Sequence, residues 1–166
     1  MKAWLKYWVL IPILHFILIA SFFVIDLPWL ALVLGVLLYY PIHILGYNIC
    51  YHKFFSHRSF VPKDWFIPVG MYCAMLALHG SPIISATIHR LHHKYNDTDK
   101  DPHNRMQGIW HSYIGWVFSY KIARKDFAAI ADLKRDYPWV FKVDKYNLWI
   151  ALTSYAIAYL ISPVFG

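Results

Sequence analysis

The chain alternates long apolar stretches with one charged central segment. Four stretches contain no Asp, Glu, Lys or Arg, and they cover residues 7–25, 27–52, 65–88 and 146–166. A helix that crosses a membrane needs about 20 mostly apolar residues. The first two stretches reach that length and are separated by Asp26 and a Leu-Pro turn, so they predict a helical hairpin with membrane helices over 7–25 and 27–50. No small-residue cleavage site follows the first helix, which is therefore expected to be a retained anchor.

The two later apolar stretches differ from each other. Residues 146–163 predict a third membrane helix that ends near Pro163. Pro and Gly residues interrupt the stretch 65–88, and a crossing there would put its two basic flanks on opposite sides of the membrane. Basic residues normally gather on the cytosolic side. This stretch is therefore expected to be re-entrant, so that it enters and leaves the membrane on one face.

The composition supports a membrane protein and argues against nucleic-acid binding. Hydrophobic residues make up 59% and charged residues 15% of the 166 residues, whereas soluble proteins carry about 25% charged residues. Every Lys and Arg lies at the N-terminus or between residues 53 and 145, so the net charge of +7 is expected to face the cytosolic side of the lipid bilayer. We predict an all-α, multi-pass integral membrane protein of one domain (1–166), with a helical hairpin, a third transmembrane helix and a cytosolic helical segment over 51–145.

Residues 121–135, within that central segment, have an amphipathic pattern. Phe127, Ile130 and Leu133 recur among Lys, Arg and Asp side chains. Such a pattern is typical of a helix that lies on the membrane surface. We expect Pro138 to end this helix.

Five of the ten histidines are spaced like metal ligands. They form an H-x4-H motif, His52 and His57, and an H-x2-H-H motif, His89, His92 and His93. On a helix the last three share one face, whereas the first two converge only if the helix frays or turns between them. So many neutral imidazoles favour an iron centre that activates oxygen over a magnesium or calcium site. The alternative is a set of interfacial histidines that reach the lipid headgroups.

The remaining histidines have less specific surroundings. His15 and His43 lie in the predicted membrane helices and are interpreted as packing or hydrogen-bonding residues. His79 is interpreted as a buried histidine with a hydrogen-bond partner, and the alternative is a residue that lines the substrate cavity. His103 and His111 follow the second motif, and they are spare ligands, residues that orient the ligands, or neither.

An acidic run, Asp97, Asp99 and Asp101, follows the second histidine motif. A calcium-binding EF-hand loop would need Gly at its sixth and Glu at its twelfth position, where this chain has Pro102 and Gly108. Calcium is therefore excluded. The acids are expected to hydrogen-bond the ligand histidines and fix their tautomers, and the alternative is a solvated polar loop.

The histidine motifs and their neighbours resemble those of the membrane fatty acid desaturases of the acyl-CoA and acyl-lipid types. The first histidine box of that family is similar to the segment from Gly46-Tyr47 to His52-Lys-Phe-Phe-Ser-His57-Arg58-Ser-Phe. The second box and its trailing motif are similar to Gly80-Ser-Pro-Ile, His89-Arg-Leu-His92-His93-Lys and Asp97-Thr-Asp-Lys-Asp101-Pro-His103-Asn104. His111-Ser-Tyr-Ile-Gly-Trp116 matches the segment that usually follows. The resemblance covers residues 40–120.

The resemblance implies a chemistry and a set of partners. In this family a histidine-bound di-iron centre, with O2 as cosubstrate, removes two hydrogens from a fatty acyl chain and leaves a cis double bond. The ninth-carbon type of enzyme is the one expected here. Electrons come from a donor such as cytochrome b5 or a ferredoxin, and the histidine boxes lie at the cytosolic face of the membrane.

The resemblance also implies roles for particular residues. The matching iron ligands are His52, His57, His89, His92 and His93. The residues expected to orient the ligands, or to serve as spare ligands, are Asp97, Asp101, His103, Asn104 and His111. The basic residues expected near the substrate headgroup are Arg58, Arg90 and Lys94.

The chain departs from the family pattern in three ways. Ser85 stands where the family usually has Trp. Thr87-Ile88 stand where the animal acyl-CoA enzymes carry Arg-Asp, and this second departure leaves lipid-linked acyl chains open as substrates. The family's third box, also H-x2-H-H, does not occur in these 166 residues, and five histidines are too few for the two-iron ligand set. The expected explanations are that the chain is a fragment, that a separate C-terminal half supplies the third box, that His103 and His111 complete the site, or that the protein is inactive.

Two other functions fit the same histidine motifs. A related membrane hydroxylase or ketolase has histidine boxes but adds oxygen to the carbon instead of forming a double bond. A catalytically inactive, truncated metal-binding membrane protein is the alternative that is not an enzyme. The Asp-Pro-His-Asn and Ser-His-Arg-Ser-Phe motifs favour desaturation.

Overall fold

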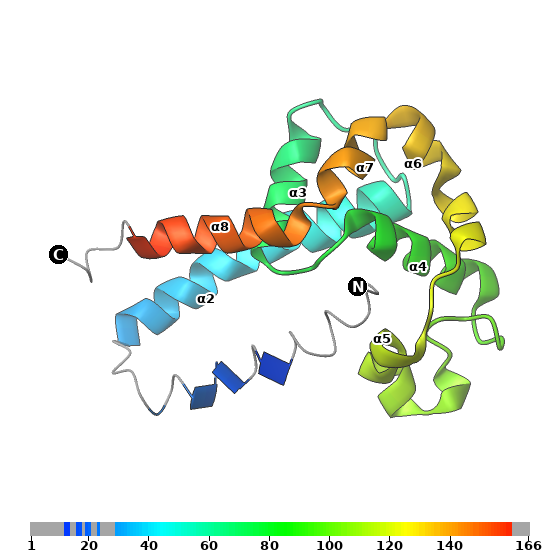
Figure 1. Ribbon diagram of the computed structural model, residues 1–166, viewed down its shortest axis with the longest axis horizontal. Coiled ribbons are helices and arrows are strands. Elements are labelled where there is room, and N and C mark those ends of the chain that lie inside the picture. The colour runs from blue at the N-terminus through cyan, green and yellow to red at the C-terminus, as the bar shows by residue number, and fades with distance from the viewer. Residues whose placement is uncertain (1–11, 14–15, 18, 21–22, 24–28, 161–166) are drawn as a thin grey trace. The chain divides into compact units, whose positions relative to one another are not determined.

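A computed structural model describes residues 12–13, 16–17, 19–20, 23 and 29–160 (Figure 1). Every regular element among them is helical, and this part of the chain contains no strand. The predicted all-α class is therefore confirmed for the described residues. Most of the predicted membrane helix 7–25, including His15, lies outside the described residues, as does the end of the predicted helix 146–163.

The elements follow one another along the chain with short connections. In order they are α2 (Trp29–His43), η1 (Ile44–Ser56), α3 (Phe66–Leu76), α4 (Pro82–Tyr95), η2 (Arg105–Gln107), η3 (His111–Gly115), α5 (Trp116–Ser119), η4 (Arg124–Ile130), α6 (Ala131–Asp136), α7 (Pro138–Asp144) and α8 (Asn147–Leu160). The chain divides into two compact units, Met1–Leu37 with Leu91–Arg124 and Leu38–Arg90 with Lys125–Gly166. The single domain over 1–166 stays a prediction.

Helix α2 continues directly into η1, which is a π-helix. The stretch Val33–Ser56 is 24 residues long, and within the described ranges it is the one helix long and apolar enough to cross a membrane. Helices α3 and α8 are apolar but shorter, with 11 and 14 residues. The multi-pass topology, the re-entrant placement of 65–88 and the cytosolic position of 51–145 stay predictions.

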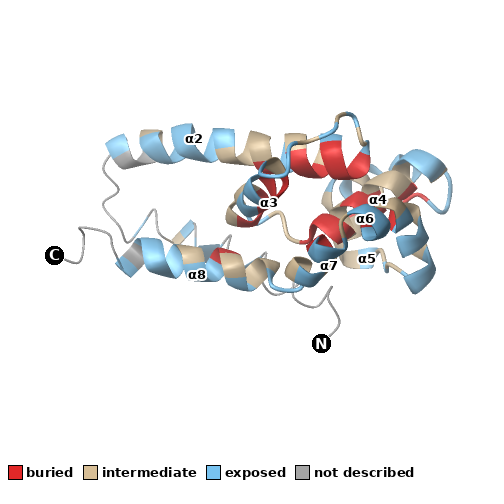
Figure 2. Cartoon of the chain, turned by 90° about the horizontal axis from the view of Figure 1, so that it is seen from above, coloured by how far each residue is buried: buried red, intermediate tan, exposed pale blue. Residues whose placement is uncertain are grey.

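The core of the second unit forms where η1 packs against α3 (Figure 2). Tyr51 and Phe55 of η1 are fully buried there, and Met71 of α3 lies against them in the same cluster. Gly46 permits this contact, because a Cβ atom added to it would lie 2.3 Å from the backbone nitrogen of Ala74. The missing side chain therefore lets the two helices approach backbone to backbone.

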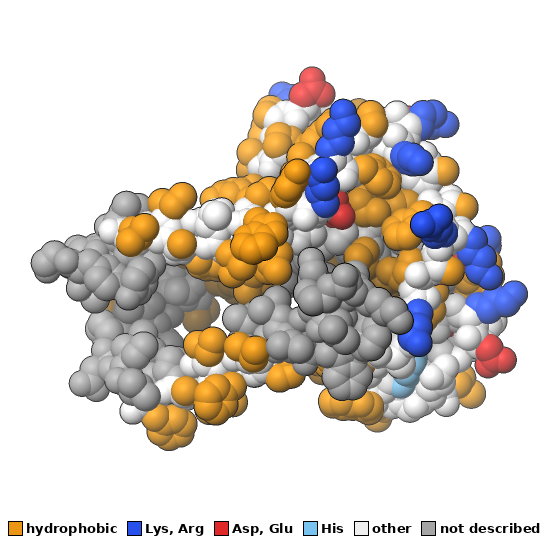
Figure 3. Space-filling model, viewed as in Figure 1, with side chains coloured by type: hydrophobic (Ala, Val, Ile, Leu, Met, Phe, Trp, Pro, Cys, Tyr) orange, Lys and Arg blue, Asp and Glu red, His pale blue; other side chains and the backbone are white. Residues whose placement is uncertain are grey.

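The charged segment after residue 124 folds onto that core. Ile130 and Leu133 have no exposed surface, and both belong to the core cluster. These two apolar positions of the amphipathic pattern therefore face the protein, whereas we expected the apolar side to face the membrane; Phe127, the third position, is 37% exposed. Pro138 follows α6 and begins α7, because its fixed φ suits the first turn of a helix. Basic side chains gather over α6 and α7, whereas the visible face of α8 is mostly hydrophobic (Figure 3).

A sharp turn between α3 and α4 sets the start of the second histidine helix. Leu78 and Gly80 have positive φ, so the chain reverses within residues 77–81. The Ser81 hydroxyl donates to Asp144 at 2.5 Å and accepts from the Ile84 backbone N–H at 3.0 Å, which caps α4. Burial raises the pKa of Asp144, although the hydrogen bond from Ser81 opposes this shift.

Candidate metal centre

Three of the five predicted ligands meet in one place in the second unit. The Nε2 atom of His57 lies 3.1 Å from Nε2 of His52 and 2.9 Å from Nε2 of His89. The ligand atoms of these three residues all lie within 4.8 Å of one another. The rings stand nearly perpendicular to each other, at 82–89°, so their nitrogens point at a common centre. We call this group the three-histidine cluster.

The π-helical geometry of η1 brings His52 and His57 together. In an α-helix, residues five apart point in directions about 140° apart, because each residue turns by about 100°. A π-helix has wider turns that close with i→i+5 hydrogen bonds. The backbone N–H of His57 donates to the carbonyl oxygen of His52 at 3.1 Å, which is such a bond. The wider turn therefore places both imidazoles on one face without the fraying that an α-helix would need.

The geometry of the cluster fits a first-row transition metal. Metal–nitrogen bonds of about 2.0–2.1 Å put neighbouring ligands of an octahedral ion about 2.9 Å apart, and those of a tetrahedral ion about 3.3 Å apart. The two observed separations, 2.9 and 3.1 Å, lie in that range. A ring nitrogen carries one proton or one lone pair, so a shared cation satisfies three converging Nε2 atoms more fully than hydrogen bonds among them.

The other two predicted ligands, His92 and His93, belong to the first unit and are not part of the three-histidine cluster. His92 Nδ1 lies 2.8 Å from the carboxylate of Asp101, whose side chain is fully buried. Such a contact fixes the tautomer of a ligand histidine and leaves Nε2 for a metal. Burial alone would raise the pKa of Asp101, but hydrogen bonds from His92 and from the backbone N–H groups of Asp97 and His103 lower it.

The residues expected to support the ligands shape the loop after α4. Asp97 has a positive φ and pairs with Arg105 at 3.2 Å. Asn104 is buried; its oxygen accepts from the backbone of Met106 and its amide donates to the carbonyl of Thr98. These contacts fix the shape of the loop that carries Asp101. Their part in metal binding stays a prediction.

His103 and His111 lie near this loop in the first unit. The His103 ring is tilted against that of Trp116, with ring centres 4.1 Å apart, and its centre lies 5.2 Å from that of His92. Burial, with a smaller effect of His92, lowers the pKa of His103 to about 4, so the ring is neutral at physiological pH. His111 begins η3 and is half-buried. No contact decides between the roles foreseen for these two residues.

The basic residues predicted to bind the substrate headgroup differ in their surroundings. Lys94 is exposed and lies over the ring of Tyr95. Arg58 and Arg90 instead bond to acidic residues of α6, namely Asp132 and Asp136. These two acids were not predicted as site residues, because they lie in a segment whose pattern is typical of a membrane-surface helix. The headgroup role stays a prediction, and the observed partners of both arginines belong to the protein.

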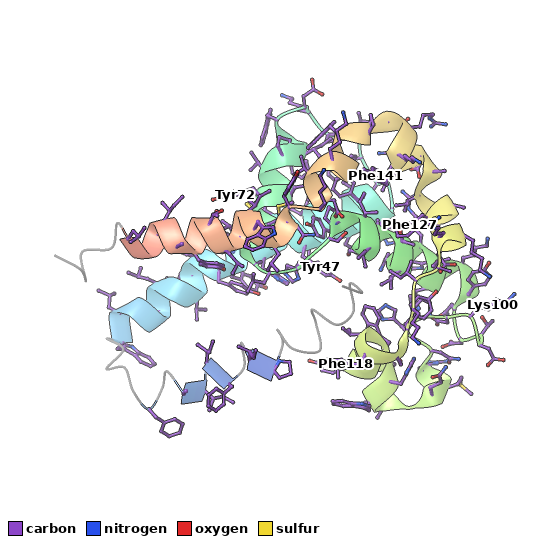
Figure 4. The ribbon with its side chains drawn as sticks, viewed as in Figure 1. Tyr47, Tyr72, Lys100, Phe118, Phe127 and Phe141 are labelled. Atoms are coloured by element: carbon purple, nitrogen blue, oxygen red, sulfur yellow. The ribbon has the colours of Figure 1, made fainter. Side chains whose placement is uncertain are left out.

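His43 and His79 form a separate pair in the second unit. Nδ1 of His43 lies 2.7 Å from Nε2 of His79, and the ring of Tyr47 stacks on His79 at 4.4 Å (Figure 4). This contact agrees with the interpretation of both as hydrogen-bonding residues. Neither belongs to the three-histidine cluster.

Comparison with known proteins places the chain in a family. A family model described as fatty acid desaturase matches residues 27–166. The chain is 36% identical over 108 residues to delta-9 acyl-lipid desaturase 2 of Arabidopsis thaliana, an alignment that covers 63% of this chain and 34% of the relative. It is 32% identical over 140 residues to the sn-1 stearoyl-lipid 9-desaturase of Anabaena variabilis, and this alignment covers 84% of this chain and 51% of the relative.

A third relative carries a different substrate in its name. The acyl-CoA 5-desaturase of Anemone leveillei is 34% identical over 125 residues, which cover 72% of this chain and 39% of the relative. No solved structure matches the chain significantly. The aligned region spans about half the length of these curated relatives or less. Because the family model matches most of the chain, including the three-histidine cluster, the chain belongs to the fatty acid desaturase family.

Proposed function

We propose that this chain provides the first two histidine boxes of a membrane desaturase that inserts a cis double bond, of the ninth-carbon type, into a fatty acyl chain. The observation that carries the proposal is the convergence of three imidazole nitrogens inside the region that matches the family. Relatives named as 9-desaturases support the position of the double bond. The lipid-linked acyl chain is the favoured substrate, since both of these names specify acyl lipids.

His52, His57 and His89 would hold iron, with His92 and His93 as the further ligands that this chain supplies. Bound iron supplies the O2-dependent oxidation that removes hydrogen from an unactivated carbon, with electrons from a donor such as cytochrome b5 or a ferredoxin. Asp101 orients the ring of His92 through Nδ1. The five histidines need a complement, so we propose that a C-terminal half with a third histidine box completes a two-iron site.

An acyl chain also requires an apolar surface. The second unit has an apolar groove of about 200 Å³ between α3, α7 and α8, lined by residues such as Met71, Trp139 and Ile150. Tyr72 of α3 also lines it (Figure 4). Part of an acyl chain fits a groove of this character. We propose that the apolar helix Val33–Ser56 anchors the protein in the bilayer and that the histidines lie at its cytosolic face.

Expression in a host that lacks its own desaturase tests this function. We expect iron in the purified protein, and fatty acids that lose two hydrogens when a complementary C-terminal half is supplied. His57→Ala should remove both, whereas His79→Ala, which changes a histidine outside the cluster, should keep the iron. Fatty acids that gain an oxygen would instead identify a hydroxylase, the second candidate. A protein without iron, with or without the C-terminal half, would contradict the proposal.

A further inference from the structure

Each of two histidines in the cluster is followed directly by an arginine, and both arginines bind the same carboxylate. His57 precedes Arg58, and His89 precedes Arg90. Asp132 of α6 receives Arg58 Nε at 3.2 Å and Arg90 Nη1 at 2.6 Å. One side chain from a distant part of the sequence therefore connects the two histidine motifs.

Arg90 is also bonded to the backbone that carries His57. Its guanidinium donates to the carbonyl oxygens of Phe55 at 2.7 Å and Ser56 at 2.9 Å, the two residues before His57. It donates in addition to the carbonyl of Ala129 and to both oxygens of Asp132. These five bonds equal the number of N–H groups that a guanidinium possesses. Arg90 therefore ties the end of η1 to the middle of α4.

Arg58 is held in a backbone conformation that arginine seldom adopts. Its φ is +54°, which turns the chain away from η1 directly after His57. The side chain pairs with Asp132 and, at 2.5 Å, with Asp136, and it lies over the rings of Phe54 and Tyr137. Such a conformation persists where the surroundings fix it from several sides. The contacts to α6 therefore fix the direction in which the chain leaves His57.

The charge of the Asp132 carboxylate is stabilised by its two arginine partners. Burial alone would raise the pKa of Asp132, but hydrogen bonds and charge from Arg90, with a smaller effect of Arg58, lower it. The carboxylate is therefore ionised at physiological pH, and its side chain is only 30% exposed. An amide in its place would keep the shape but leave two arginines without their shared counter-charge.

We propose that Asp132 is a positioning residue that fixes the position of His57 relative to His89 by binding both Arg58 and Arg90. The inference rests on the proposed function, because metal binding requires the two histidines to lie at the right distance from each other. Asp132 acts on the two ligands through Arg58 and Arg90, which directly follow them in the chain. The effect of a residue of this kind on metal affinity is typically about 10- to 100-fold.

Binding of Co²⁺, a spectroscopic probe for histidine sites, tests the proposal in the purified full chain. We expect Asp132→Asn to weaken Co²⁺ binding about 10- to 100-fold and to change the visible absorption bands. Asp132→Glu, which keeps the charge and can reach both arginines, should restore most of the affinity. The matched control is Asp64→Asn, because Asp64 is exposed and forms no ion pair within the described ranges; it should bind like the wild type.

A second variant covers the case in which Asp132→Asn fails to fold. Arg90→Lys keeps a positive charge near Asp132, but a single ammonium cannot reach all three carbonyls and both carboxylate oxygens. We expect a folded protein, by circular dichroism and size-exclusion chromatography, with the same loss of Co²⁺ affinity. A folded Asp132→Asn or Arg90→Lys variant with unchanged affinity and spectrum would overturn the proposal and leave the proposed function intact.

Cross-linking measures how close positions 57 and 89 lie to each other, and it needs no metal. His57→Cys and His89→Cys together should be joined efficiently by a short bifunctional maleimide, and adding Asp132→Asn should lower the yield several-fold, whereas adding the control Asp64→Asn should not. Equal yields in the double-cysteine protein with and without Asp132→Asn would overturn the proposal. If the wild type binds no Co²⁺ while the cross-link depends on Asp132, the metal-binding function fails and the positioning role stands.

Discussion

Gly46 provides a sharp test of how closely η1 and α3 pack. Replacing it with Ala adds a Cβ atom 2.3 Å from the backbone nitrogen of Ala74 and 2.6 Å from its Cα atom. Ordinary contacts begin near 3.4 Å, so the helices have to part by about 1 Å. Overpacking costs about 1–3 kcal/mol where side chains can adjust, and here the neighbours are backbone, so we expect about 3 kcal/mol. A chain of this size should then melt about 6–12 °C lower.

Thermal unfolding of the detergent-purified protein, followed by circular dichroism, measures this shift. The matched control is Gly35→Ala, because a Cβ atom at that helical glycine meets nothing within 4 Å. Ala is the better helix former by about 1 kcal/mol, so this control should melt at the wild-type temperature or slightly above it. A Gly46→Ala protein that melts within about 2 °C of the wild type would refute the close approach of the two helices.

Three further predictions concern the supports of the histidine helices. Asp101→Asn should lower metal affinity about 10- to 100-fold, measured by Co²⁺ titration, because His92 loses its charged partner. The pKa of His103 is lowered to about 4 from the ordinary 6.5, so between pH 6.5 and pH 4 the unfolded chain binds a proton that the folded chain does not. The free energy of unfolding, measured by chemical denaturation, should therefore fall as the pH drops from 6.5 to 4. His103→Gln should make this fall with pH smaller. Ser81→Ala should destabilise the protein by about 0.5–2 kcal/mol in the same assay, because it removes the cap of α4 and a bond to Asp144.

The histidine motifs could be recognised in the sequence because ligand spacing is a local property. Helical periodicity alone puts His89, His92 and His93 on one face, whatever the rest of the fold does. That acidic residues after the second motif hydrogen-bond a ligand histidine was predicted for the same reason: His92, in α4, and Asp101, in the loop that follows, lie only nine residues apart. The convergence of His52 and His57 requires a π-helical turn, and the sequence of this segment does not distinguish a π-helix from an α-helix.

The sequence by itself determined the helical class, the long apolar run that forms the 33–56 helix and the histidine motifs, because apolar run length and residue spacing are properties of the sequence alone. The tertiary structure alone decided what the charged segment after residue 124 faces. An amphipathic pattern is the same whether its apolar side meets lipid or protein, and here Ile130 and Leu133 meet the core. The partnership of Asp132 with Arg58 and Arg90 depends on that choice, since only a segment folded against the core brings its carboxylate to the arginines beside the histidines.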